Sequence, residues 1–304
     1  MEMIVMATMY FAKININKEI YEVYKKQENY NKILNKLIEE DWQKSKIVEQ
    51  KLNTDRDDSE REIYKFINID RISDKSYLVG RLINVFKDEI AIYDEKKDNI
   101  SSMDQEKLSR AIPFYFDWKN EMVAFIPTQK FKRQRFLKYF ELLINDIYGE
   151  NQFSVYIMNN ASDFKKQLRT LNTVSKIEIT LIPPNSNKDE FDDLFPKDGD
   201  ELKETGGTKF HQEIYAPESR KKGLNMDAKL VKRSVEGIAK GFGVFTATGK
   251  TTDDKKKTIS SDSEAPYKKN IKYSPGDSLN EVADYGKNGI EEILISNIEK
   301  RIDI

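Results

Sequence analysis

The segment IPFYFDWKNEMVAFIPTQKFKRQRFLKYFELLINDIY, residues 112–148, carries the clearest structural pattern in the chain. Polar and apolar residues alternate over Ile112–Trp118, and they alternate again over Glu121–Pro127 after the polar pair Lys119-Asn120. Two alternating runs joined by a short polar turn predict a β-hairpin, with Met122, Ala124 and Ile126 on one face. The apolar residues that follow recur at three- and four-residue spacing, which predicts an amphipathic helix over 132–148.

The same patterns predict further elements on both sides of this hairpin. Before it we expect strands at 3–16, 62–72, 77–83 and 89–93, with a helical stretch at 18–52 and a loop at 55–60. After it we expect strands at 153–158 and 177–182, with a short helix capped by Ser162 between them. The last strand–helix–strand step predicts a right-handed parallel crossover. We therefore predict an α+β domain over 1–184: a mixed β-sheet with a ββαβαβ core and helices on one face.

The amino-acid composition of the chain changes after Pro184. Residues 185–205 carry eight acidic and three basic side chains, and 185–304 is predicted to form a smaller, basic α+β part. Its expected elements are a helix over 226–240 ending at Gly241, strands at 242–248 and 257–261, and a C-terminal helix over 288–301.

Composition excludes several classes of chemistry. The 304 residues include 51 Lys+Arg and 52 Asp+Glu, so the net charge of −1 favours no partner by itself. The absence of Cys excludes disulfides, thiolate zinc sites and Cys nucleophiles, and a single His excludes mechanisms that need two imidazoles. No run of 18 apolar residues and no secretory signal is evident, so we expect a cytoplasmic protein without a membrane span.

Three motifs resemble functional sites but do not match the required patterns. Residues 243–251 resemble a phosphate loop, but five residues separate the two glycines where the motif needs four, so a strand entering a polar hairpin is expected instead. His211 is interpreted as a surface or core histidine. Glu178 does not continue into the Glu-x-Lys pattern of nuclease sheets, because the residue two further on is Thr180. We expect no cofactor, no metal site and no catalytic residues, although a carboxylate-bound Mg²⁺ stays open.

Basic residues cluster at two places. The first set lies within nine residues at the start of the helix predicted over 132–148, where cations oppose the helix dipole and an anion would be favoured. The second lies in 205–273, which holds 15 basic and 8 acidic residues. The predicted nucleic-acid-binding residues are Lys130, Lys132, Arg133, Arg135, Lys138, Arg220, Lys221, Lys222, Lys229, Lys232 and Arg233. The alternative is that both sets are solvated faces, or that the acidic stretch at 189–204 pairs with the second set.

Three features of the chain carry a resemblance to known families. They are the hairpin Pro113-Phe-Tyr-Phe … Met122-Val-Ala-Phe-Ile126, the helix after it and the segment Ile177-Glu-Ile-Thr-Leu-Ile-Pro-Pro-Asn185. In the order of these elements, over about residues 60–270, the chain resembles the Rex-type phage-exclusion proteins and an uncharacterised bacterial family found in phage-defence loci. The resemblance extends to the strand region at 241–248. It implies an intracellular defence protein that binds nucleic acid or senses phage, as a dimer, and it carries over no catalytic residues.

Together these observations predict an antiphage defence protein that binds nucleic acid, DNA rather than RNA, through basic patches and without catalysis. The competing hypotheses are a Mg²⁺-dependent nuclease effector and a module that recognises a phage protein. We also expect a homodimer, because two-fold pairing is the commonest closed assembly and would double a weak basic patch. A partner protein from a defence operon is a further candidate.

Overall fold

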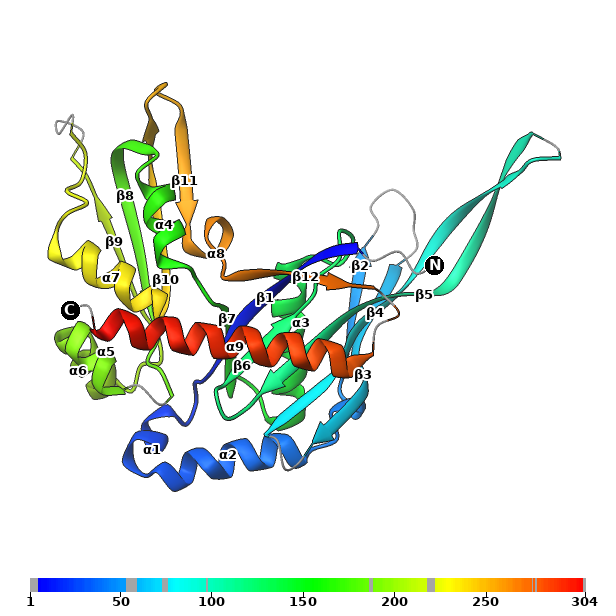
Figure 1. Cartoon of the computed structure of the whole chain (residues 1–304), viewed down its shortest axis with the longest axis horizontal. Helices are drawn as coiled ribbons and strands as arrows, with labels where there is room; N and C mark the ends of the chain where they lie inside the picture. The colour runs from blue at the N-terminus through cyan, green and yellow to red at the C-terminus, as the bar shows by residue number, and fades with distance from the viewer. Residues whose placement is uncertain are drawn as a thin grey trace.

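The computed structural model describes residues 5–52, 59–72, 76–96, 98–185, 188–217, 222–274, 276 and 278–302. They form two antiparallel sheets with helices packed on them (Figure 1). The predicted α+β class is confirmed. Among the helices of the described ranges, none combines the length and the apolar character needed to cross a membrane.

The larger sheet has the strand order β12-β1-β6-β5-β4-β3-β2. β12 and β7 pair with different halves of β1, at Val5–Tyr10 and Ala12–Ile16. The predicted hairpin is β5–β6, in which Asp117 pairs with Met122. The strands of this sheet are β1 (Val5–Ile16), β2 (Lys46–Leu52), β3 (Ser59–Ile72), β4 (Tyr77–Asp94), β5 (Asn99–Asp117), β6 (Met122–Phe125), β7 (Phe153–Ile157) and β12 (Lys268–Tyr273).

Both faces of the larger sheet are covered. α3 (Arg133–Tyr148) packs on the face that carries Phe114 and Phe116, while α9 (Leu279–Ile302) packs on the face that carries Tyr115. The prediction that helices cover one face is therefore wrong. Phe114, Tyr115 and Phe116 are all buried, so β5 is apolar on both faces and its sequence alone does not show how many helices cover it.

The predicted helical stretch 18–52 divides into several elements. It contains α1 (Ile20–Lys25), α2 (Gln27–Glu39), a short 3₁₀ turn η1 (Trp42–Lys44) and β2. Lys26 has an extended backbone, with φ −151° and ψ 122°, and separates the two helices. β2 is a strand because it pairs with β3 along its whole length.

β3 and β4 form the hairpin predicted for 62–72 and 77–83. The strand predicted separately at 89–93 is the continuation of β4, which pairs with β5 in a hairpin that the sequence patterns did not predict. β4 pairs with β3 only as far as Val85, and beyond it the β4–β5 hairpin projects from the body as an arm (Figure 1). Residues 73–75 of the turn predicted at 73–76, and residues 55–58 of the loop predicted at 55–60, lie outside the described residues.

The smaller sheet has the order β11-β10-β8-β9 and is covered on one face by helices. β7 and β8 lie in different sheets, and every described pairing is antiparallel, so the predicted mixed sheet and parallel crossover are wrong. β10 and β11 form the predicted hairpin, which confirms that the segment resembling a phosphate loop is a strand. The elements are α4 (Ala161–Leu168), β8 (Leu171–Leu181), α5 (Lys188–Leu194), α6 (Pro196–Thr205), β9 (Phe210–Tyr215), α7 (Lys229–Ala239), β10 (Gly243–Thr251), β11 (Lys256–Ser260) and α8 (Ser261–Glu264).

The boundary predicted at residue 184 does not separate the two sheets. β12 joins β1 in the larger sheet, and β8 joins β9 and β10 in the smaller one, so each sheet draws strands from both sides of the boundary. Asn185 ties the two parts together. Its Oδ1 accepts a hydrogen bond from the Ile16 N–H at 2.6 Å, and its Nδ2 donates to the Ile14 carbonyl at 2.9 Å. The Pro-Pro-Asn turn therefore places a side-chain amide on the backbone of β1.

Candidate functional site

A pocket of about 820 Å³ lies where α3 begins, and it is lined by residues of β1, β4, β5 and β12 and of the segment that joins β6 to α3. Its charged lining residues are Arg81, Lys132 and Arg133, and its lining contains no carboxylate. Tyr10 and Tyr273 supply aromatic walls. Within the described ranges, neither Arg81 nor Lys132 forms an ion pair. The pocket is therefore electropositive and suited to an anion.

The local structure of the α3 start adds to this field. Lys132 has an extended backbone and no side chain caps the helix, while the Arg135 and Phe136 N–H groups donate to the Lys132 carbonyl. The free N–H groups of the first turn and the helix dipole place partial positive charge at this end. Arg133 reaches back over the Tyr10 ring, 5.1 Å from its centre, and contacts the Ser263 carbonyl at 3.4 Å.

The first predicted basic set divides into two groups. Lys130, Lys132 and Arg133 lie at or beside the pocket, and the two lysines are exposed. Arg135 instead donates to the carboxylate of Glu62 and to the Tyr64 hydroxyl. Arg135 is therefore part of a packed network between α3 and β3.

Lys138 belongs to the same network. Its Nζ contacts Glu49 at 2.8 Å, and this hydrogen bond raises the pKa of Lys138 and lowers that of Glu49. Tyr139 binds the same carboxylate through its hydroxyl, and its ring stacks on Tyr64 with 3.3 Å between the ring centres. Arg135 and Lys138 therefore join α3 to β2 and β3, and they are less available to a ligand than Lys132.

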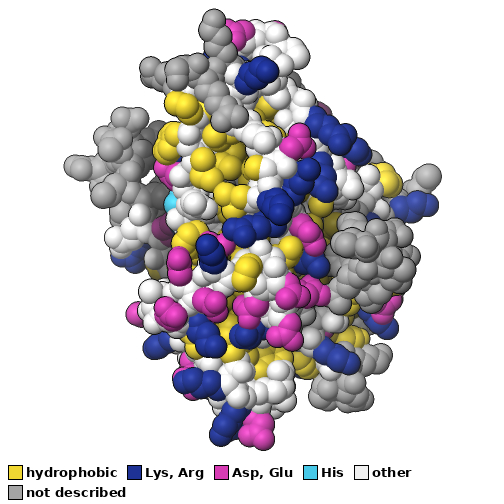
Figure 2. Space-filling view, turned by 90° about the vertical axis from the view of Figure 1, so that its left-hand side faces the viewer, with side chains coloured by type: hydrophobic (Ala, Val, Ile, Leu, Met, Phe, Trp, Pro, Cys, Tyr) yellow, Lys and Arg dark blue, Asp and Glu magenta, His cyan; other side chains and the backbone are white. Residues whose placement is uncertain are grey.

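The second predicted basic set meets the acidic segment that precedes it. On α7, Arg233 pairs with Asp198 at 3.1 Å, and Lys240 at the end of the helix pairs with Glu190 at 3.2 Å. The predicted alternative, in which the acidic stretch pairs with this set, therefore holds for Arg233. Figure 2 shows the side of the molecule that lies on the left in Figure 1. Lys and Arg side chains form a band across the upper half of this side, with acidic side chains between and below them.

The rest of the second set is dispersed. Lys222 and Lys232 line another pocket, of about 1160 Å³, between α4 and α7, together with Lys165 and Arg169. Lys232 lies 3.6 Å from Asp227, and Lys229 is exposed. Arg220 and Lys221 lie outside the described residues. The structure thus brings part of this set to one pocket rim and not into a single patch.

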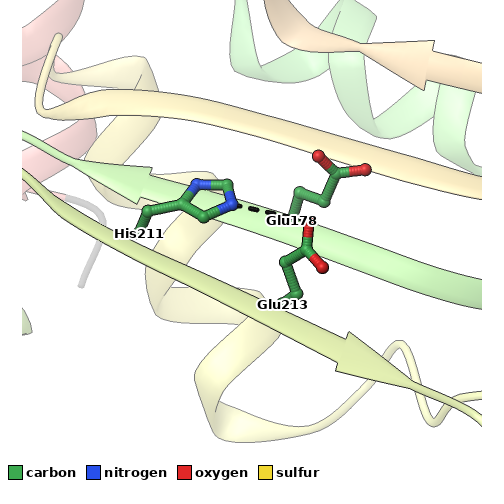
Figure 3. Close-up of side chains that lie close together, drawn as sticks. All are labelled: Glu178, His211 and Glu213. Carbon is green, nitrogen blue, oxygen red and sulfur yellow. Dashed lines mark ion pairs between the residues drawn. The ribbon is translucent and has the colours of Figure 1, made fainter.

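A third cluster occupies the face of the smaller sheet opposite its helices. Glu178 on β8 pairs in register with Glu213 on β9, and Thr180 pairs with His211. Figure 3 shows the imidazole and the two carboxylates of this cluster drawn together on the two strands. One ligand atom from each of Glu178, His211 and Glu213 lies within 4.8 Å of the other two.

The hydrogen bonds around this cluster orient each group. Thr180 Oγ1 lies 3.0 Å from His211 Nδ1, which leaves Nε2 on the side of Glu213, 3.6 Å from Oε1. Lys176 Nζ lies between the carboxylates, 2.9 Å from Glu178 and 2.8 Å from Glu213. The Lys176 ammonium, with help from the Tyr215 hydroxyl, lowers the pKa of Glu213 to about 2.

The sequence alone does not reveal this cluster. It predicts a surface or core role for His211, and Glu178 lacks the Lys two residues further on that the nuclease pattern needs. The imidazole is exposed, and the relevant lysine, Lys176, comes two residues before Glu178. The period-two spacing of polar residues in 176–180 and 211–215 was a detectable signal, but the pairing of β8 with β9 was not.

Most of the chain matches one protein family. The profile of a domain of unknown function, DUF4747, matches residues 7–285. The chain belongs to this family. The match spans strands of both sheets and ends at residue 285, near the start of α9. The sequence matches none of the curated proteins with which it was compared.

Proposed function

We propose that this DUF4747 protein binds nucleic acid, DNA in preference to RNA, through the pocket at the start of α3, without catalysis and as part of antiphage defence in the cytoplasm. The observation that supports this proposal is the pocket lining, which contains Arg81, Lys132 and Arg133 and no carboxylate. Phosphate contacts from Lys, Arg and helix N-termini supply most non-specific affinity for nucleic acid.

The tyrosines support a nucleic acid over a simple anion. Tyr10, whose ring carries the Arg133 guanidinium, and Tyr273 line the same pocket, and both aromatic rings and guanidinium planes accept stacked bases whatever their sequence. A volume of about 820 Å³ also lies within the range of ligand sites. The pocket therefore offers both a phosphate contact and a stacking surface.

The test is the salt dependence of binding to duplex DNA, single-stranded DNA and RNA. In the triple variant Arg81→Ala/Lys132→Ala/Arg133→Ala, we expect weaker binding and a shallower plot of log affinity against log salt. Each lost phosphate contact lowers the slope for duplex DNA by about 0.9, so three contacts lower it by up to about three. Arg135 is left unchanged in this design, because its removal would leave the Glu62 carboxylate without that charge partner.

The matched control removes the same charge elsewhere. Lys25, Lys44 and Lys287 are exposed by 67%, 84% and 61% and lie on other elements. Their triple Ala variant should keep the wild-type slope. A folded pocket variant that binds nucleic acid with unchanged affinity and an unchanged salt-dependence slope would contradict the proposal. Cleavage of plasmid or RNA that depends on Mg²⁺ would instead favour the nuclease hypothesis.

The defence role and the assembly rest on the resemblance to phage-exclusion proteins and not on the pocket. A homodimer would bring two α3 pockets to one nucleic acid and raise avidity. Light scattering at micromolar concentration, with and without DNA, measures this assembly, and a plaque assay on cells expressing the pocket variant measures the defence role. A partner protein from a defence operon would show as a co-purifying subunit.

A further inference from the structure

Imidazole and thiolate, the usual side-chain ligands of Zn²⁺ besides carboxylates, are scarce in this chain. The sequence contains one His and no Cys, so His211 supplies the single imidazole and no thiolate is available. That single imidazole lies beside two carboxylates, Glu178 and Glu213, on adjacent strands. We propose that these three side chains form a Zn²⁺-type metal site on the open face of the smaller sheet, with Lys176 as its built-in competitor.

The geometry fits three protein ligands around a small cation. Metal–ligand bonds of about 2.0–2.2 Å place neighbouring ligand atoms roughly 3–4 Å apart. The ligand atoms of the cluster lie within 4.8 Å of one another, so small rotations of the half-buried Glu178 and the exposed Glu213 side chains close the site. Three protein ligands leave positions for water, as in metal sites that are open to a further ligand.

The imidazole is already oriented for this role. Thr180 Oγ1 holds Nδ1 of His211 at 3.0 Å and leaves Nε2 on the side of the carboxylates. Metal-binding histidines generally have such a partner on the other ring nitrogen, which fixes the tautomer and the ring plane. Thr180 is therefore a positioning residue, and Nε2 is the ligand atom.

Lys176 explains why the carboxylates tolerate each other without a metal. Its ammonium contacts both at 2.8–2.9 Å, where a divalent ion would otherwise neutralise them. It also lies 5.2 Å from the centre of the Tyr215 ring, whose face attracts a cation. The flexible Lys176 side chain can rest on that ring when a metal takes its position, so the metal competes with one internal ammonium.

The single histidine makes the test direct. In the full chain without a polyhistidine tag, the imidazole NMR signals report His211 alone. We expect one equivalent of Zn²⁺ to shift or broaden them, while Mg²⁺ leaves them unchanged because it prefers oxygen ligands. Signals that do not move with an excess of Zn²⁺, in the wild type and in Lys176→Met, would overturn the proposal.

Variants give a second readout by calorimetric Zn²⁺ titration. Lys176→Met removes the competitor and should tighten binding about tenfold or more, whereas Thr180→Val should weaken it about 10–100-fold, as is typical when the partner of a metal-binding histidine is lost. His211→Gln should reduce binding at least as much. All three positions are at least partly exposed, so the fold should persist, which circular dichroism checks.

An affinity for Zn²⁺ that is unchanged by His211→Gln would show that the cluster is an ion-pair network alone. Neither readout involves nucleic acid. A negative result for Zn²⁺ binding therefore does not bear on nucleic-acid binding at the α3 pocket.

Discussion

Asp262, in α8, is a carboxyl group placed in an unfavourable environment. Its Oδ1 is buried without a hydrogen-bond partner, and burial raises its pKa to about 6, although Asn159 and Arg133 partly oppose this. A carboxyl whose folded-state pKa is raised binds a proton in the folded protein before the unfolded chain does. The protein therefore loses stability as the pH rises from about 4 to about 6, and this loss persists above pH 6.

The variant Asp262→Asn removes this titration. We expect it to exceed the wild type in free energy of unfolding by about 1–2 kcal/mol at pH 7.5, and by much less at pH 4.5. Urea unfolding at the two pH values measures the difference. Asp163→Asn, at an exposed position on α4, is the matched control. An equal effect of Asp262→Asn at both pH values would contradict the assignment.

At the scale of elements, α9 docks on the larger sheet through glycines. A Cβ at Gly286 would lie 2.7–2.8 Å from Tyr115 atoms that include its own Cβ, and these atoms cannot move away without moving β5. Gly289 meets the buried ring of Phe11 in the same way. The two glycines let the helix backbone approach the sheet and bury its apolar surface.

This contact predicts the sign of one substitution. Alanine normally stabilises a helix relative to glycine by about 1 kcal/mol. Gly286→Ala should instead destabilise the protein by about 1–3 kcal/mol, because overpacking at the sheet outweighs the helix propensity. Asn288→Ala, at an exposed position of α9, is the control and should change stability by less than about 0.5 kcal/mol. Thermal unfolding compares them, and equal stability of the two variants would argue against this docking.

At the scale of the whole molecule, the two sheets depend on strands from both ends of the chain. Residues 1–184 alone lack β12 for β1, α9 for the face that carries Tyr115, and both partners of β8. We expect this fragment not to fold cooperatively, because unpaired edges and an uncovered apolar face remain exposed. Near-ultraviolet circular dichroism and urea unfolding test this, with the full chain as control. A cooperative transition of the isolated fragment would show that the predicted boundary separates folding units.

Local patterns determined much of the secondary structure. The β5–β6 hairpin, α3, β7, α7 and the β10–β11 hairpin all follow from residue periodicity, because each depends on neighbours a few positions away. The sequence also showed the electropositive start of α3, since Lys132 and Arg133 and the helix end are adjacent in the chain.

Tertiary structure alone decided which strands share a sheet and which charges are available. Arg135 is bound by Glu62 and Arg233 by Asp198, and in both cases the partner is far away in sequence. His211 meets Glu178 only because β8 and β9 pair across two intervening helices. Periodicity records which face of an element is apolar, but the partner of that face is chosen by the combined burial of all elements. The chain's composition restricts nitrogen-bound metal to one histidine, and only the fold supplies the carboxylates beside it.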